Sequence, residues 1–172
     1  SGQIINIIQI PILYKVLLQE SIILLIILLI NKQYLKQTIL YKRVSLINIY
    51  TLWIILFFST AIWLGISVKT PLYTALILIL SALLVGITEE YIFRGLLFPL
   101  LSKGSVKNGI LLSTFIFSMW HILNINTSSV PVLIGQLLFT LGFGAFLAVV
   151  YLTKKNIIIP MLLHGTYNSL SF

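Results

Sequence analysis

The chain has 172 residues, of which 59% are hydrophobic and only 8% charged, and its net charge is +8. Soluble domains carry about 25% charged residues, so this composition excludes an ordinary soluble domain and indicates a multi-pass membrane protein. The chain contains neither cysteine nor aspartate, which excludes disulfides, thiolate metal sites, a cysteine nucleophile and a protease built on two aspartates.

Hydrophobic runs predict an all-α bundle of about six transmembrane helices, since about 20 residues cross a bilayer core of about 30 Å. In chain order they cover residues 11–30, 44–68, 71–101, 110–123, 131–152 and 157–172. The third run is too long for one perpendicular span, so we expect it to be tilted, broken near Gly86 or extended past the membrane surface. We expect a single integral membrane domain, 1–172, whose N-terminal helices, 1–68, carry no motif.

Basic residues alternate between the predicted loops. Loops 31–43, 102–109 and 153–156 carry most of the lysines, whereas the two loops between them carry one basic residue and none. The positive-inside rule then predicts that these three loops are cytoplasmic in a cell membrane and that both termini face outside. The richness in isoleucine, asparagine and lysine suggests a bacterial source. The bilayer is the expected partner of this charge, and we assign no nucleic-acid partner.

Several polar side chains are predicted to lie in one layer of the membrane. Counted from the basic loops at about 1.5 Å per residue, Glu89, His121, His164 and Asn168 lie about 12–20 Å deep. The layer includes both histidines of the chain and one of its three acidic residues. Ionisable groups cost a few kcal/mol at this depth, so they predict a functional site.

The helical period separates the two adjacent glutamates. Glu90 and Arg94 are four residues apart and are expected to form a supporting ion pair. Glu89 points about 100° away and is left to face His121. A water molecule held between Glu89 and His121 could attack a carbonyl group, and His164 could donate a hydrogen bond to the resulting oxyanion.

Three ordered motifs, each on a separate predicted helix, resemble those of the CPBP family, the CAAX proteases and bacteriocin-processing enzymes also called the Abi family. They are Glu89-Glu90-x-x-x-Arg94, Phe117-x-x-x-His121 and His164-x-x-x-Asn168. The resemblance implies that residues 71–172 form a CPBP-like catalytic core and that the protein is an intramembrane endopeptidase.

The same resemblance implies the role of each residue. Glu89 is the base that activates water and His121 is its partner, while His164 and Asn168 form the oxyanion pocket. The expected substrate is a small hydrophobic or membrane-associated peptide, such as a leader, pheromone or bacteriocin precursor, or a membrane protein. The sequence does not predict an oligomeric state.

Other functions and mechanisms stay open beside the glutamate endopeptidase. A non-catalytic membrane partner, such as a bacteriocin immunity protein or a regulator of a sensor kinase, would keep the fold for binding. No metal cofactor is expected, although Glu89, His121 and His164 could supply a zinc site with two histidines and one carboxylate. A serine protease is disfavoured because the glycine-flanked Ser105 lies in a basic loop, away from the depth of the histidines.

Overall fold

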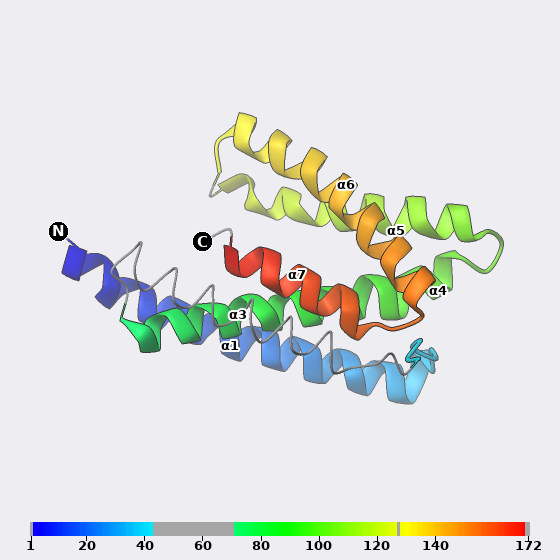
Figure 1. Cartoon of the computed structure of the whole chain (residues 1–172), viewed down its shortest axis with the longest axis horizontal. Coiled ribbons are helices and arrows are strands. Elements are labelled where there is room, and N and C mark those ends of the chain that lie inside the picture. The colour runs from blue at the N-terminus through cyan, green and yellow to red at the C-terminus, as the bar shows by residue number, and fades with distance from the viewer. Residues whose placement is uncertain (1, 43–70, 127, 171–172) are drawn as a thin grey trace.

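Helices account for nearly all of the structure, as the composition predicts. The computed structural model describes residues 2–42, 71–126 and 128–170. Within these ranges there is no β-strand, only an isolated β-bridge between Tyr41 and Asn156. In chain order the elements are α1 (Gly2–Ile30), η1 (Asn31–Leu35), α3 (Leu72–Glu90), η2 (Tyr91–Leu97), α4 (Phe98–Leu101), α5 (Val106–Trp120), η3 (His121–Asn126), α6 (Val130–Lys154) and α7 (Ile158–Leu170), as drawn in Figure 1.

Four stretches of the described residues are long and apolar enough to cross a membrane: Tyr14–Leu35, Leu72–Leu101, Val106–Ile125 and Val130–Lys154. Five of the six predicted spans fall within the described residues, and four of these five are confirmed as long enough to cross a membrane. The predicted span 44–68 lies outside the described residues, and α7, which we expected to be the sixth span, has only 13 residues. Its length is about 20 Å at 1.5 Å per residue, too short for a hydrocarbon core of about 30 Å.

The long third stretch is one helix without a break. Helix α3 runs through the π-helical turn η2 into α4, so the stretch Leu72–Leu101 has 30 residues and is about 45 Å long. Of the three alternatives for this stretch, a break near Gly86 is not found, because Gly86 is a buried residue within α3. The irregularity comes just after the glutamate pair instead, where η2 begins at Tyr91. Such π-helical turns inside α-helices are frequent at functional sites.

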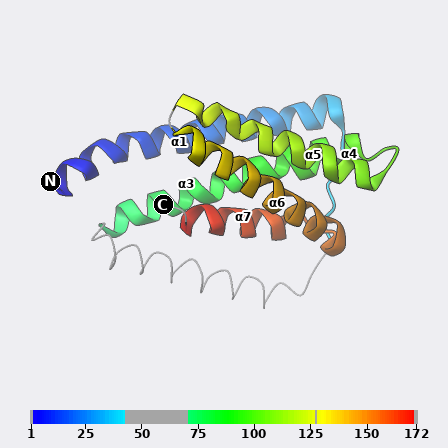
Figure 2. The same ribbon diagram turned by 90° about the horizontal axis from the view of Figure 1, so that it is seen from above.

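Helix α3 is the centre of the bundle, with α1 and α7 packed against it and α5 and α6 forming a second pair (Figures 1 and 2). Two glycines bring α3 and α7 unusually close. A Cβ atom added to Gly86 would lie 2.6 Å from the amide nitrogen of Gly165, and one added to Gly165 would lie 2.9 Å from the Cα atom of Leu83. Small residues permit this backbone approach, which is a common way for helices to associate in membranes.

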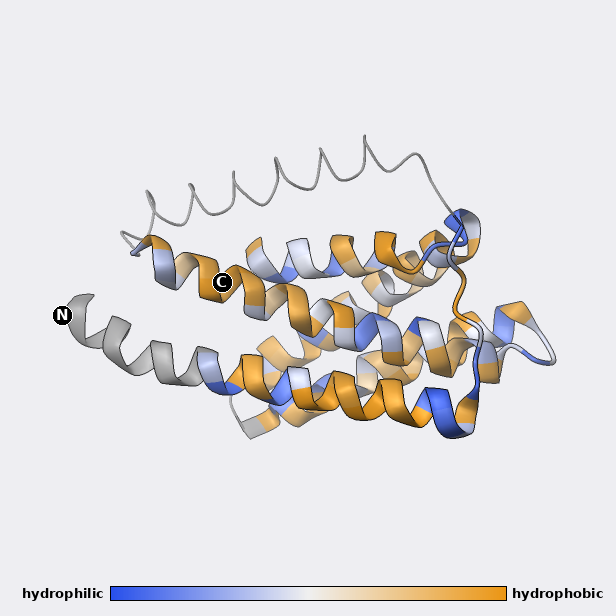
Figure 3. Cartoon of the chain, turned by 90° about the horizontal axis from the view of Figure 1, so that it is seen from below, coloured by the Kyte–Doolittle hydropathy of each residue, from blue (hydrophilic) through white to orange (hydrophobic). Residues whose placement is uncertain are grey.

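The three basic loops lie at one end of the bundle, where α1 ends, α4 turns into α5 and α6 turns into α7 (Figures 1 and 2). Hydrogen bonds join two of these loops, because the amide of Lys42 donates to the carbonyl of Lys155 and the side chain of Asn156 donates to the carbonyl of Lys42. Hydrophilic residues gather at this end, and apolar residues cover most of the helices (Figure 3). The arrangement agrees with a membrane protein whose loops differ in charge between the two sides.

Candidate active site

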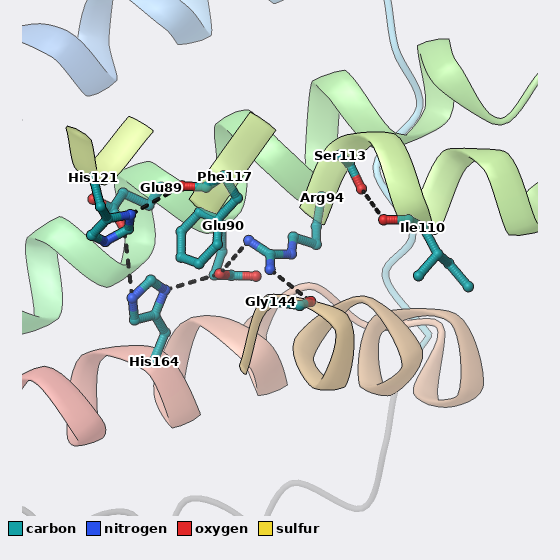
Figure 4. Close-up of polar contacts among 9 residues, drawn as sticks. All are labelled: Glu89, Glu90, Arg94, Ile110, Ser113, Phe117, His121, Gly144 and His164. Carbon is teal, nitrogen blue, oxygen red and sulfur yellow. Dashed lines mark hydrogen bonds and ion pairs between the residues drawn. The ribbon is translucent and has the colours of Figure 1, made fainter. Parts of the chain in front are cut away.

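The two glutamates end α3 and differ in exposure. The side chain of Glu89 is 17% exposed, whereas that of Glu90 is 0% exposed. Adjacent helical residues point about 100° apart, so one carboxylate reaches an accessible space while its neighbour turns into the bundle. Figure 4 shows both side chains among the polar residues of α5, α6 and α7.

Glu90 belongs to a buried polar network. Its Oε1 atom accepts a hydrogen bond from Nη1 of Arg94 at 2.9 Å and lies 2.9 Å from Nδ1 of His164. The Nη2 atom of Arg94 donates to the backbone carbonyl of Gly144 on α6, also at 2.9 Å. The ion pair expected from the four-residue spacing is thus present, and it joins α3 to α6 and α7. Hydrogen bonds to charged groups offset part of the desolvation cost of burying both charges.

Two atoms of this ion pair remain unsatisfied. The Oε2 atom of Glu90 and the Nε atom of Arg94 are buried without a hydrogen-bond partner among the described residues. Leaving such groups unpaired destabilises a fold, by about 1–3 kcal/mol for an ordinary polar atom. A local conflict of this kind is typical of a functional site, where a sequence is not optimised for stability alone.

The ring of Phe117 on α5 is the hub around which the site packs. The guanidinium carbon of Arg94 lies 4.6 Å from its centroid, a cation–π distance. The rings of His121 and His164 meet it edge to face, with centroids 5.1 and 5.6 Å away. A side chain at Gly144 would press on this ring, because an added Cβ would lie 2.9 Å from Cδ1 of Phe117. Phe117 therefore sets the mutual placement of both histidines and the arginine.

His121 follows the last residue of α5, and its ring is oriented by that helix. Its Nδ1 atom lies 3.0 Å from the carbonyl oxygen of Phe117. A carbonyl only accepts, so Nδ1 carries the hydrogen, and in the neutral ring Nε2 is the acceptor. In this tautomer Nε2 of His121 can accept a hydrogen bond from a water molecule.

His164 on α7 bridges the two glutamates. Its Nδ1 atom lies 2.9 Å from Oε1 of Glu90, and its Nε2 atom lies 3.5 Å from Oε2 of Glu89. Glu89 was expected to face His121, and the ion pair that it forms is with His164. Asn168 lies one helical turn farther along α7 and is half-buried. Glu89 thus lies against His164, and the rings of His164 and His121 both pack on Phe117 (Figure 4).

The residues that the sequence analysis did not single out are glycines. Gly144 provides the carbonyl that binds Arg94, and Gly165 allows α7 to approach α3 next to His164. Glycines within apolar helices are the available sequence signal for such close approach. Ser105 has a structural role, because its side chain caps the first turn of α5 by accepting from the amide of Asn108.

The same geometry bears on the zinc alternative. No group of three histidine or acidic residues in the described ranges is arranged to hold a metal ion. The Nδ1 atoms of His164 and His121 face a carboxylate and a carbonyl, which are also the usual outer partners of zinc-bound histidines, so zinc stays an alternative.

Comparison with family models connects this site to known proteins. The model described as type II CAAX prenyl endopeptidase Rce1-like matches residues 52–170, more than half of the chain. The chain belongs to the Rce1-like family. This confirms the resemblance to the CPBP proteases that the three motifs indicated. Comparison with curated proteins and with solved structures found no significant match.

Membership in the Rce1-like family places the chain among membrane-embedded peptidases whose substrates are peptides or proteins at the bilayer. The matched region contains all three motifs, with both glutamates, both histidines and Asn168. Helix α1 lies outside it.

Proposed function

We propose that the protein hydrolyses a peptide bond in a small hydrophobic or membrane-associated peptide and that Glu89 activates the attacking water. The observation that carries this proposal is the difference between the two glutamates. Glu90 is fully buried and held by Arg94 and His164, whereas Glu89 keeps part of its side chain exposed. A general base must reach the water from which it takes a proton, and only Glu89 of this pair meets that requirement.

In the proposed reaction the water oxygen attacks the scissile carbonyl carbon while its proton passes to Glu89. The neutral His121 ring orients this water by accepting a hydrogen bond at Nε2. The C–N bond then breaks, and Glu89 returns the proton to the leaving amine. No metal ion is needed for any of these transfers.

The oxyanion that forms needs hydrogen-bond donors, and we assign His164 and Asn168 to this task. With both ring nitrogens of His164 protonated, Nδ1 donates to Glu90 and Nε2 donates to the oxyanion. Glu90 then stabilises the positive charge on the ring and sets its orientation, as the third member of a catalytic group commonly does. Removal of one oxyanion donor costs about 10²–10³-fold in rate in other hydrolases.

The test compares wild type with Glu89→Gln in lipid vesicles. Leader, pheromone and bacteriocin-precursor peptides and a prenylated CAAX peptide are incubated with each, and products are identified by mass spectrometry. We expect wild type to cleave at least one peptide and Glu89→Gln to be reduced by about 10³-fold or more, the range for loss of a catalytic base acting in a group. Equal cleavage by both proteins would disprove the assignment of Glu89. A Glu89→Gln strain with unchanged biological function would favour the non-catalytic binding role.

We also propose that the end of the bundle with the basic loops is cytoplasmic. The chain has no cysteine, so single cysteines introduced at Lys103 and at Ser129 can be labelled without background. Both positions are exposed and they lie at opposite ends of α5 and α6. A membrane-impermeant maleimide added to intact cells should label Ser129→Cys and leave Lys103→Cys unlabelled. The opposite pattern would reverse the orientation.

A further inference from the structure

The two residues that flank the glutamate pair in the chain both contact the first helical segment, and one of them is hydrogen-bonded to it. Thr88 precedes Glu89; its hydroxyl donates to the carbonyl of Leu84 in its own helix at 2.9 Å, and its side chain lies within interaction distance of the carboxyl group of Glu20 on α1. Tyr91 follows Glu90, and its hydroxyl accepts a hydrogen bond from Nδ2 of Asn31 at 3.0 Å. The two contacts therefore bracket the pair, although α1 and η1 lie outside the family-matched region.

Asn31, the partner of Tyr91, is itself held in place by hydrogen bonds. The Oδ1 atom of Asn31 accepts from the amide of Gln37 at 2.9 Å, and its Nδ2 atom also approaches the carbonyl of Gln37 at 3.3 Å. Asn31 is buried, and Glu20 is half-buried between α1 and α3. A side chain fixed by several hydrogen bonds can orient its neighbour more strictly than a freely rotating one.

The two contacts restrain the rotation of α3 about its own axis. Thr88 and Tyr91 are three residues apart, so they share one face of the helix, and that face meets α1. Gly86 contacts Gly165 of α7 on another side. With the helix held from two sides, Glu89 is aimed in one direction.

The orientation of Glu89 is sensitive to this restraint. A rotation of α3 by about 10° moves a carboxylate about 6 Å from the axis by about 1 Å. A displacement of about 1 Å in a catalytic group can lower a rate by about 10²-fold. Glu20 is also near enough to Glu89 for their charges to interact.

We propose that Glu20 and Asn31 are positioning residues for the glutamate pair, so that the first helical segment is a working part of the active site. The proposal rests on the proposed role of Glu89 as the base. It assigns no contact with substrate to Glu20 or Asn31, which act through Thr88 and Tyr91. The prediction is a change in turnover and in the accessibility of Glu89, with little change in substrate binding.

The experiment uses the full chain in vesicles and the substituted proteins Glu20→Leu and Tyr91→Phe. Each removes one of the two contacts, and we expect each to lower kcat about 3- to 10-fold and both together to lower it about 10- to 100-fold, with KM unchanged. Glu20→Gln keeps a donor and an acceptor at the same place and should restore most of kcat.

Matched controls come from the same segment. Ser21→Ala removes a hydroxyl that bonds only to the carbonyl of Leu17 in its own helix, and Tyr34→Phe removes a hydroxyl from a side chain that is 76% exposed. Both should behave as wild type. Thermal unfolding is measured for every variant, because a merely structural contact would lower stability without changing kcat of the folded protein.

A second readout needs no substrate. A hydrophobic carbodiimide modifies accessible carboxyl groups, and mass spectrometry gives the rate for Glu89 alone. We expect modification of Glu89 to be at least about 3-fold faster in Glu20→Leu and in Tyr91→Phe than in the two controls, since a loosened helix exposes the carboxylate more often.

The outcomes separate this proposal from the proposed function. Unchanged kcat and unchanged Glu89 modification in both variants would overturn the positioning role while leaving Glu89 as the base. Loss of stability alone, or equal defects in Glu20→Gln and Glu20→Leu, would overturn the hydrogen-bond role of Glu20. If no peptide is cleaved by wild type, the carbodiimide rates still decide whether α1 controls Glu89.

Discussion

A methyl group at Gly86 is the smallest change that should disturb the active site without touching any catalytic side chain. In Gly86→Ala the added Cβ would lie 2.6 Å from the amide nitrogen of Gly165 and 2.9 Å from its Cα atom. Ordinary contacts of this kind are 3.4–4 Å, so the backbones of α3 and α7 must separate by about 1 Å, because neither contacting atom belongs to a flexible side chain.

The separation acts on His164, the neighbour of Gly165. Its Nδ1 atom lies 2.9 Å from Glu90 and its Nε2 atom 3.5 Å from Glu89. An increase of about 1 Å breaks the hydrogen bond to Glu90 and weakens the ion pair with Glu89. We expect kcat to fall by about 10²-fold from misplacement of this one side chain, and overpacking to lower the free energy of unfolding by about 1–3 kcal/mol.

The assay measures initial rates of peptide cleavage in vesicles together with thermal unfolding in detergent. Gly142→Ala is the matched control, because a Cβ at Gly142 in α6 meets no atom within 4 Å. Alanine favours a helix over glycine by about 1 kcal/mol, so this control should be as active as wild type and at least as stable. A fully active Gly86→Ala protein would refute the reasoning, since the helices would then adapt without moving His164.

Three further substitutions or treatments test other parts of the site. Arg94→Lys should destabilise the protein by about 2–4 kcal/mol in thermal unfolding, because one ammonium group cannot reach both Glu90 and the carbonyl of Gly144 as the guanidinium does; unchanged stability would show that the ion pair contributes little. Ser105→Ala should cost about 1 kcal/mol through loss of the α5 cap and leave cleavage intact, whereas an inactive, folded variant would reopen the serine mechanism. Dialysis against a strong zinc chelator should leave cleavage unchanged; activity that disappears and returns only with zinc would establish the metal mechanism.

The helices could be predicted well where they depend on neighbouring residues in the sequence. The hydrophobic runs predicted helices, and the boundaries of the long stretch 71–101 agree with Leu72–Leu101 to within one residue. The spacing of Glu90 and Arg94 predicted their ion pair, which the structure contains. These features depend on composition and on the helical period, both of which can be read from neighbouring residues.

The helix count was harder to predict because hydrophobicity does not decide where a helix ends in space. The run 157–172 is apolar like the others, yet α7 is only 13 residues long. It packs closely on α3, so its length follows from this packing and not from hydrophobicity alone. The same tertiary contact makes Gly86 a packing point and not a break.

By itself the sequence determined an all-α membrane chain, the motifs that mark its family, and one polar layer holding the glutamates and the histidines. Only the tertiary structure decided that His164 lies between Glu89 and Glu90, that Phe117 is the hub of the site, and that the residues beside the glutamates contact α1 and η1. The physical reason is that the helical period determines which residues share a face of one helix. Which faces meet, and at what distance, depends on packing between helices, and here two glycines set that distance.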